Sequence, residues 1–396
     1  MDKPLITAAS RTGLVTEYYF SAKLAQIERM RQEGADIINL GIGSPDMAPA
    51  YGVSAELARS ASVSSNHGYQ GYRGIPTLRQ AFAEWYGKYF AVTLDPASEI
   101  LPLIGSKEGI MHISMAFLDP GDEVLVPDPG YPAYAAAASL AGGVVRKYDL
   151  TEETGWLPDI RAIEAAGTEK VKIMWINYPH MPTGAKATRE LFHELVGFAL
   201  RNHILLCNDN PYSFILNSDH LSILSVPEAR GTALEMNSLS KSHNMAGWRI
   251  GMLAGHKRYI DDVLKVKSNM DSGMFKPLQE AAVLALASPD EWYTKLNEVY
   301  IRRRRYVGEI MDELGCSYNP YQSGLFLWGR IPDTYGDAGE LTEELLHRNH
   351  LFVTPGSVFG DNGLRYIRLS LCAEEEIMIK ALQRIRSGAK KKVTTN

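Results

Sequence analysis

The stretch SLSKSHNMAGWRIG, residues 238–251, decides how the rest of this 396-residue sequence is interpreted. It places Lys241 three residues after Ser238 and eight residues before Arg249. A lysine amine condenses with an aldehyde when burial or nearby positive charge lowers its pKa. The hydroxyl of Ser238 and the planar guanidinium of Arg249 suit a phosphate dianion. On its own, Lys241 would be interpreted as a surface lysine and Arg249 as a structural arginine. Their combination in one stretch predicts a site that binds an aldehyde and a phosphate.

Short apolar runs alternate with helical patterns before that stretch. A helix is predicted from about Thr188 to Asn202, because its apolar residues recur on one face. Apolar strands that alternate with helices predict an α/β fold, with a mostly parallel sheet covered on both faces. Ligands of such sheets bind beyond the carboxyl ends of the strands, so polar residues there become candidates. The strand-sized runs are LPLIG (101–105), EVLVPD (123–128), VKIMWIN (171–177) and ILLCND (204–209).

The 238–251 stretch closely resembles the lysine motif SxSKxxxxxGWRxG of class I and II aminotransferases, which are pyridoxal-5′-phosphate (PLP) enzymes of fold type I. The resemblance runs from about Tyr18 to Arg368, with the other landmarks in the same order. It implies a large domain with a mostly parallel central sheet and a smaller α+β domain. The implied parts are an N-terminal segment (1–46) that joins the small domain, a large PLP-binding domain (47–285) and a small C-terminal domain (286–396).

The resemblance also implies roles for residues at the predicted strand ends. Lys241 is the catalytic residue and carries PLP as a Schiff base. Asp209 pairs with the protonated ring nitrogen, which keeps the ring an electron sink. Tyr212 bonds the phenolic oxygen of the ring, and Tyr131 stacks on the ring.

Phosphate binding is assigned to two places. Ser106 and Lys107 open a helix after a strand, where backbone N–H groups form a cradle that Ser238 and Arg249 complete. By resemblance, Tyr69 in YQGYRGIPTLRQA (69–81) reaches the phosphate of the other subunit, which implies a homodimer with shared active sites.

The substrate-binding set consists of Arg368, Gly43, Met181 and Tyr18. Arg368 is expected to hold the substrate α-carboxylate, because a planar fork binds a planar carboxylate bidentately. Gly43 lies in LGIGSPD, and Tyr18 is assigned to the pocket for the substrate side chain.

One position departs from the family. Relatives carry Asn-Asn-Pro-Thr-Gly where this sequence reads NYPHMPTG (177–184), so Met181 replaces the second Asn. A thioether is a weak acceptor and cannot donate. Tyr212 is then the visible donor to the phenolic oxygen, which predicts a raised pKa for the Lys241 Schiff base. His180 is the neighbour that could replace the lost group, and Met181-Pro182 is a candidate cis peptide bond.

The predicted activity is PLP-dependent transamination (EC 2.6.1.-), by a ping-pong mechanism between an L-amino acid and a 2-oxo acid. Two alternatives stay open: a C–S β-lyase, whose family members often carry His at position 180, and a non-catalytic PLP-binding paralogue, which Met181 alone favours. The lysine stretch and KSNMDSGMFKPLQEAA (267–282) look similar to the LL-diaminopimelate aminotransferase branch. Aspartate and alanine aminotransferases share most of these residues, so the amino acid, the 2-oxo acid and the pathway stay unassigned.

The composition argues against some kinds of partner and indicates a compartment. A net charge of −5 argues against nucleic acid, and no apolar run approaches the roughly 18–20 residues of a membrane span. Cys207, Cys316 and Cys372 are odd in number and not in a metal-type spacing, so no disulfide framework and no metal are expected, and the cytoplasm is the expected compartment. The arginine run 302–305 is interpreted as a solvated helix face.

Overall fold

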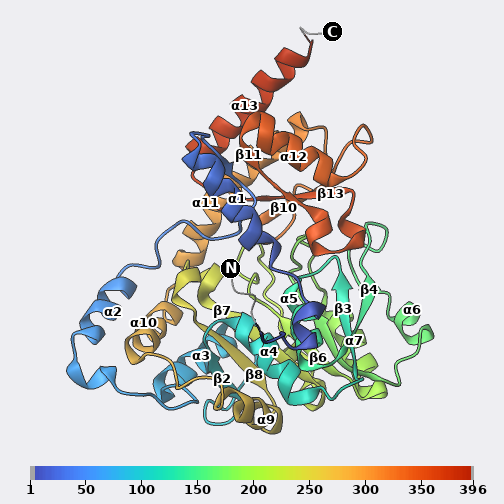
Figure 1. Cartoon of the computed structure of the whole chain (residues 1–396). Coiled ribbons are helices and arrows are strands. Elements are labelled where there is room, and N and C mark those ends of the chain that lie inside the picture. The colour runs from blue at the N-terminus through green and yellow to red at the C-terminus, as the bar shows by residue number, and fades with distance from the viewer. Residues whose placement is uncertain (1–4, 394–396) are drawn as a thin grey trace.

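Seven strands form the central sheet of the computed structural model, which describes residues 5–393 (Figure 1). Their order across the sheet is β2-β8-β7-β6-β5-β3-β4. Neighbouring strands are parallel except for the two pairs that β8 makes, with β2 and with β7. The predicted mostly parallel sheet is confirmed. The strands are β2 (Ile100–Leu103), β3 (Glu123–Asp128), β4 (Val144–Asp149), β5 (Val171–Ile176), β6 (Leu205–Asp209), β7 (Ala233–Ser238) and β8 (Gly251–Gly255).

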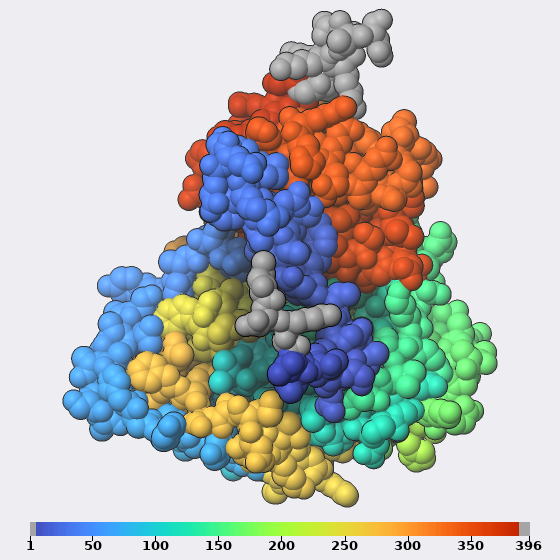
Figure 2. Space-filling view, viewed as in Figure 1, coloured from blue at the N-terminus to red at the C-terminus, as the bar shows by residue number. Residues whose placement is uncertain are grey.

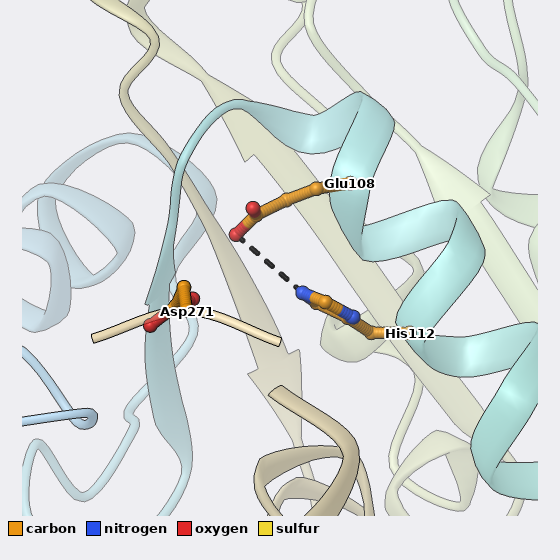
Figure 3. Close-up of side chains that lie close together, drawn as sticks. All are labelled: Glu108, His112 and Asp271. Atoms are coloured by element: carbon orange, nitrogen blue, oxygen red, sulfur yellow. Dashed lines mark ion pairs between the residues drawn. The ribbon is translucent and has the colours of Figure 1, made fainter. Parts of the chain in front are cut away.

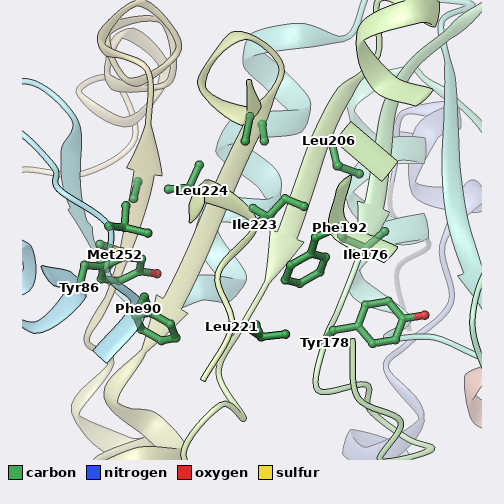
Figure 4. Packing of buried hydrophobic residues seen from close by; sticks show 14 of the residues in the cluster. Tyr86, Phe90, Ile176, Tyr178, Phe192, Leu206, Leu221, Ile223, Leu224 and Met252 are labelled. Atoms are coloured by element: carbon green, nitrogen blue, oxygen red, sulfur yellow. The ribbon is translucent and has the colours of Figure 1, made fainter. Parts of the chain in front are cut away.

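Successive side chains of the central strands enter different packed layers. In β5, Ile173 and Trp175 pack with α4, α5 and α9, whereas Met174 and Ile176 pack with α3, α6, α7 and α10. Figure 4 shows part of this second layer, with Ile176 close to Phe192. Burial on both faces explains why the strands read as continuous apolar runs. The helices are α3 (Pro76–Phe90), α4 (Ser106–Phe117), α5 (Ala133–Ala141), α6 (Ile160–Ala165), α7 (Arg189–Asn202), α9 (Lys257–Lys267) and α10 (Lys276–Leu286), and α2 (Val53–Ala61) packs on α10.

Helix α7 begins where the sequence predicts it. The hydroxyl oxygen of Thr188 accepts a hydrogen bond from the N–H of Leu191 at 3.1 Å, which satisfies one of the free donors of the first turn. The helix ends at Asn202, before His203 in the left-handed conformation (φ +55°). The predicted helix is therefore confirmed.

A smaller part of the molecule is built from both ends of the chain. Its antiparallel sheet has the order β12-β13-β10-β9, and β1 pairs in parallel with β11. In Figure 1 the blue helix α1 lies beside the orange and red C-terminal elements. The elements are α1 (Tyr19–Gln32), β1 (Ile38–Asn39), α11 (Asp290–Glu313), β9 (Ser317–Tyr318), β10 (Phe326–Arg330), α12 (Ala338–Asn349), β11 (Leu351–Phe352), β12 (Thr354–Pro355), β13 (Tyr366–Ser370) and α13 (Glu375–Val393).

The two packed cores meet within α11. Tyr293 belongs to the core of the large sheet, whereas Leu296 and the following inward residues belong to the small core. Figure 2 shows the blue N-terminal residues covering the junction between the base and the orange and red upper part. The boundaries at residues 46 and 285 stay predictions.

The arginine run on α11 is not a uniform surface. Arg303 is buried, and its guanidinium donates to both carboxylate oxygens of Asp46 at 2.6 and 2.8 Å. Arg302 is half-exposed and pairs with Glu375. The interpretation of the run as a solvated face is wrong for Arg303, because this position turns toward the core. Within residues 5–393, no helix combines the length and apolar character needed to cross a membrane.

Candidate active site

A cavity of about 640 Å³ lies between the carboxyl ends of the parallel strands and the small sheet. It brings together nearly all the residues that the sequence singled out. One predicted residue, Tyr69, does not line it, and its side chain is 93% exposed. The predicted residues that line the cavity are Tyr18, Gly43, Ser106, Lys107, Tyr131, Met181, Asp209, Tyr212, Ser238, Lys241, Arg249 and Arg368.

Lys241 reaches the cavity from the short helix α8 (Leu239–Ser242), directly after β7. Its Nζ donates to the carbonyl oxygen of Gly43 at 2.7 Å. Burial lowers the pKa of the Lys241 amine, and the positive charges of Arg368 and Arg249 act in the same direction. A lowered pKa makes the uncharged, nucleophilic amine more abundant at neutral pH.

Asp209 is the last residue of β6, and only one of its two carboxylate oxygens accepts a hydrogen bond from the described residues. Its Oδ2 accepts a hydrogen bond from the hydroxyl of Tyr134 at 3.0 Å. Its Oδ1 is buried and has no hydrogen-bond partner among the described residues. Burial raises the pKa of Asp209 to about 7, while the Tyr134 bond and the charge of Lys241 lower it. A buried carboxylate oxygen without a donor costs about 1–3 kcal/mol, and the N–H of a protonated pyridine ring would satisfy it.

The segment that carries Arg249 approaches the chain at Gly105, just before the first turn of α4. Gly105 precedes this helix with φ +79°, and a Cβ at this position would lie 2.1 Å from Nη2 of Arg249. Glycine thus lets the Arg249 guanidinium approach the start of α4. Ser238 lies nearby in the cavity wall, with its Oγ accepting from the N–H of Ser240 at 3.1 Å. Free helix N–H groups, a hydroxyl and a guanidinium fit a phosphate dianion.

Arg368 projects from β13 and is only 4% exposed. Its Nη2 donates to the carbonyl of Gly41 at 2.7 Å, and its Cζ lies 3.8 Å from the ring centroid of Phe326. Its Nε has no hydrogen-bond partner, and no carboxylate in the described chain pairs with it. Burial lowers the pKa of Arg368 to about 10, so the side chain stays charged at neutral pH. A buried cation without a counter-ion is costly, which indicates a site built for an anionic ligand.

Met181 lines the cavity beside Arg368, the other side chain assigned to the substrate-binding set. Its backbone N–H donates to Oδ1 of Asn177 at 2.8 Å, and the predicted cis bond to Pro182 is present. His180 does not line the cavity, and its Nδ1 lies 2.8 Å from the hydroxyl of Thr183. Burial lowers the pKa of His180 to about 3. The idea that His180 replaces the lost amide is therefore wrong.

The cavity-wall residues that sequence reasoning missed include Tyr134, Asn177 and Phe326. Asn177 ends the strand-sized run VKIMWIN, so the rule on strand ends applied to it as well as to Asp209. Tyr134 lies in the first turn of α5, three residues after Tyr131, and its backbone N–H donates to the carbonyl oxygen of Tyr131 at 3.2 Å. Phe326 carries no local signal, because its role depends on where β10 lies beside β13.

Comparison with known proteins agrees with this geometry. The family model "Aminotransferase class I and II" matches residues 35–385. LL-diaminopimelate aminotransferase of Oleidesulfovibrio alaskensis is 40% identical over 388 residues, covering 96% of this chain and 99% of that protein. The enzyme of the same name from Aquifex aeolicus is 40% identical over 385 residues, covering 96% and 98%.

Solved structures give the same result. Substrate-bound BacF from Bacillus subtilis superposes with a TM-score of 0.93 at 32% identity, covering 97% of this chain and 98% of that one. A single mutant of Thermus thermophilus aspartate aminotransferase gives 0.90 at 28% identity, covering 97% and 100%. These relatives lend no support to the lyase or the non-catalytic alternative. The chain is therefore a member of the class I and II aminotransferases, the PLP-dependent enzymes that transfer an amino group between an amino acid and a 2-oxo acid.

Proposed function

We propose that the amino donor binds through its α-carboxylate to Arg368 and that LL-diaminopimelate is the donor to test first. The single observation that carries the first part is the buried guanidinium of Arg368, which has no carboxylate partner in the described chain. The second part rests on the name shared by the relatives at about 40% identity.

The charges around the cavity favour anionic ligands. Among the described residues, Lys107, Lys241, Arg249 and Arg368 line it, against one carboxylate, that of Asp209. Lys107 lies with its Nζ 4.4 Å from the ring centroid of Tyr18. An excess of positive charge suits a phosphate together with the carboxylates of a substrate such as diaminopimelate.

When bound, PLP supplies an aldehyde that condenses with amines and a ring that accepts the electrons released at the substrate α-carbon. The Nζ of Lys241 would hold the aldehyde carbon before substrate arrives. Once free, the same amine would take the proton from the substrate α-carbon. Ser106, Ser238 and Arg249 would bind the phosphate, and Oδ1 of Asp209 would accept the N–H of the ring nitrogen. Tyr131 would stack on the ring and Tyr212 would donate to its phenolic oxygen.

Arg368 and the small part of the molecule would orient the substrate. A carboxylate fixed by the guanidinium fork leaves the α-carbon with few orientations, which lowers the entropy cost of proton transfer. The aromatic rings of Phe326 and Phe359, with centroids 3.8 and 4.6 Å from Cζ of Arg368, hold the guanidinium in place and exclude water from it.

We also propose that the enzyme is a homodimer in which Tyr69 reaches the partner's phosphate site. The support is the 93% exposure of Tyr69 together with its place outside the cavity of its own chain. A cytoplasmic role in amino acid metabolism is part of the same proposal, since all three cysteines are free.

The absorbance spectrum of the purified holoenzyme tests the proposed donor. LL-diaminopimelate, glutamate, aspartate and alanine are added one at a time without a 2-oxo acid. Conversion of the visible band to the amine form of the cofactor by LL-diaminopimelate supports the proposal. Conversion by another amino acid alone would replace the donor and leave the role of Arg368 in place. If Arg368→Leu converts the visible band to the amine form as well as wild type does, the proposal that Arg368 binds the substrate α-carboxylate is wrong.

A further inference from the structure

Three side chains outside the active site converge between α4 and the segment that follows α9. Glu108 and His112 lie one helical turn apart on α4 and extend toward the loop that carries Asp271 (Figure 3). Nε2 of His112 is 3.7 Å from Oε1 of Glu108. One nitrogen or oxygen atom from each of the three residues lies within 4.8 Å of the others. The sequence analysis expected no metal from the spacing of the cysteines. Asp271 is far from Glu108 and His112 along the chain, so no local spacing indicates this cluster.

His112 is the second observation that points to a ligand. Its side chain is only 5% exposed, yet neither ring nitrogen has a hydrogen-bond partner in the described chain. Nearly all buried polar groups in folded proteins have a partner, and leaving one without costs about 1–3 kcal/mol. Nε2 of His112 points toward Glu108, so an ion held among the three side chains would give this nitrogen its missing partner.

We propose that Glu108, His112 and Asp271 bind one divalent transition-metal ion, with Zn²⁺ as the representative ion. One imidazole nitrogen and two carboxylate oxygens are a ligand set that Zn²⁺ accepts, and three protein ligands leave a fourth position for water. The two carboxylates balance the charge of the ion. A pair on one helix at i and i+4 presents its ligand atoms on the same face.

Lys267 sets the strength of this site. Its side chain is 2% exposed, and its Nζ forms an ion pair with Oδ2 of Asp271 at 2.5 Å. A metal ion at Asp271 therefore meets a neighbouring positive charge, which weakens its binding. Lys267 holds Asp271 in position when no metal is bound and competes with the metal for the same carboxylate.

The site would also stabilise the start of α4. Oε1 of Glu108 accepts the backbone N–H of Ile104 at 2.7 Å, two residues before Ser106 opens the helix. An ion held by Glu108, His112 and Asp271 would tie this first turn to the loop after α9. Metal binding is therefore expected to raise the melting temperature of the holoenzyme.

The test is a Zn²⁺ titration of the holoenzyme by calorimetry after removal of bound metals with a chelator. One ion per chain is expected, located by anomalous scattering between the three side chains. His112→Leu is expected to weaken binding by about tenfold or more, as loss of a ligand does at metal sites. Lys267→Met is expected to tighten binding by about tenfold, because it removes the competing charge.

A second Glu–His pair in this chain serves as the matched control. Glu343 and His347 have the same spacing on α12 and an Nε2–Oε2 distance of 3.5 Å, but His347 is 57% exposed. His347→Leu is expected to leave the affinity unchanged. Equal affinity in wild type and His112→Leu, an ion located elsewhere, or weaker binding in Lys267→Met would each overturn the proposal. The Lys267→Met result decides the question if His112→Leu fails to fold.

Discussion

Nη1 of Arg368 lies 3.2 Å from the sulfur of Met181. A thioether is a weak acceptor, so this contact uses little of the donor capacity of the guanidinium. The carbonyl of Gly41 and the ring of Phe326 fix the side chain instead. The family's amide is absent here, and with it a donor toward the cofactor and the substrate carboxylate.

Met181→Asn is expected to lower the apparent pKa of the visible cofactor band by about one unit, since one hydrogen bond to a charged group is worth roughly 1.5–3 kcal/mol. The added amide donor stabilises negative charge on the phenolic oxygen. A pH titration of the holoenzyme's absorbance measures this pKa. Met181→Leu has no donor and should titrate like wild type, and a Met181→Asn curve that overlays wild type would contradict the argument.

The cofactor-free protein should become less stable as pH rises from about 5 to 8, in part because of Asp209. Its pKa is about 7 when folded and 3.8 in the unfolded reference, so the folded state binds more protons between these values. The free energy of unfolding therefore falls as pH rises through this window. Urea unfolding at pH 5 and pH 8 should show a smaller loss for Asp209→Asn than for wild type. Identical losses in the two proteins would refute the cost assigned to burying this carboxylate.

Of the residues that the structure describes, two lysines line the cavity, and only Lys241 is expected to hold the cofactor. Borohydride reduction of the holoenzyme followed by peptide mass spectrometry is expected to place the added mass on Lys241. Lys107 lies at the first turn of α4 with its Nζ over Tyr18, and it serves as the internal control. Lys107→Ala should keep the label and Lys241→Ala should lose it. A label on the peptide of Lys107 would reverse the assignment.

Shared active sites predict complementation between two inactive variants. Tyr69→Ala removes a residue that would serve the partner's site, and Lys241→Ala inactivates its own site. Mixed after unfolding and refolding together, they should recover about a quarter of wild-type activity, because half of the dimers contain one intact site of two. Each variant refolded alone gives the baseline. If Tyr69 acted within its own chain, each site of a mixed dimer would carry one of the two changes, and no activity above the baseline would be recovered.

Gly105→Ala is expected to weaken cofactor binding by about tenfold or more, because the loss of a charged hydrogen bond is worth at least about 1.4 kcal/mol. The added Cβ would lie 2.1 Å from Nη2 of Arg249, and the backbone at Gly105 has φ +79°. Equilibrium dialysis with PLP measures the effect. Gly155→Ala is the control, since Gly155 also has a positive φ (+63°) but no heavy atom within 4 Å of the added Cβ. Similar affinities in the two variants would contradict the prediction that the contact with Arg249 makes Gly105 necessary.

The sequence predicted the features that repeat locally or sit at strand ends. Continuous apolar runs identify β5 and β6, and Thr188 marks the start of α7, because burial and capping act within a few residues. The carboxylate of Asp209 was found for the same reason. The resemblance supplied Arg368, whose role depends on the approach of β13 to the large sheet.

The features that the sequence did not predict depend on side-chain direction after packing. Arg303 lies in a run of four identical residues, and only its position on α11 decides that it meets Asp46. The partner of Asp209, Tyr134, depends on how α5 packs over the sheet. The convergence of Asp271 on His112 requires two elements far apart in the chain, for which no local pattern exists.

The pairing of β1 with β11 also orders events during synthesis of the chain. Ile38 pairs with Leu351, and the small core includes Phe20 and Ile27 from α1 together with Ile385 from α13. At the usual speed of a ribosome, the partners of β1 are made about 15–60 s after β1 itself. Throughout that interval α1 lacks the part of the small core that β10, β11, β13 and α13 provide. A segment made early in synthesis is thus among the last to fold, and a chaperone has reason to hold it.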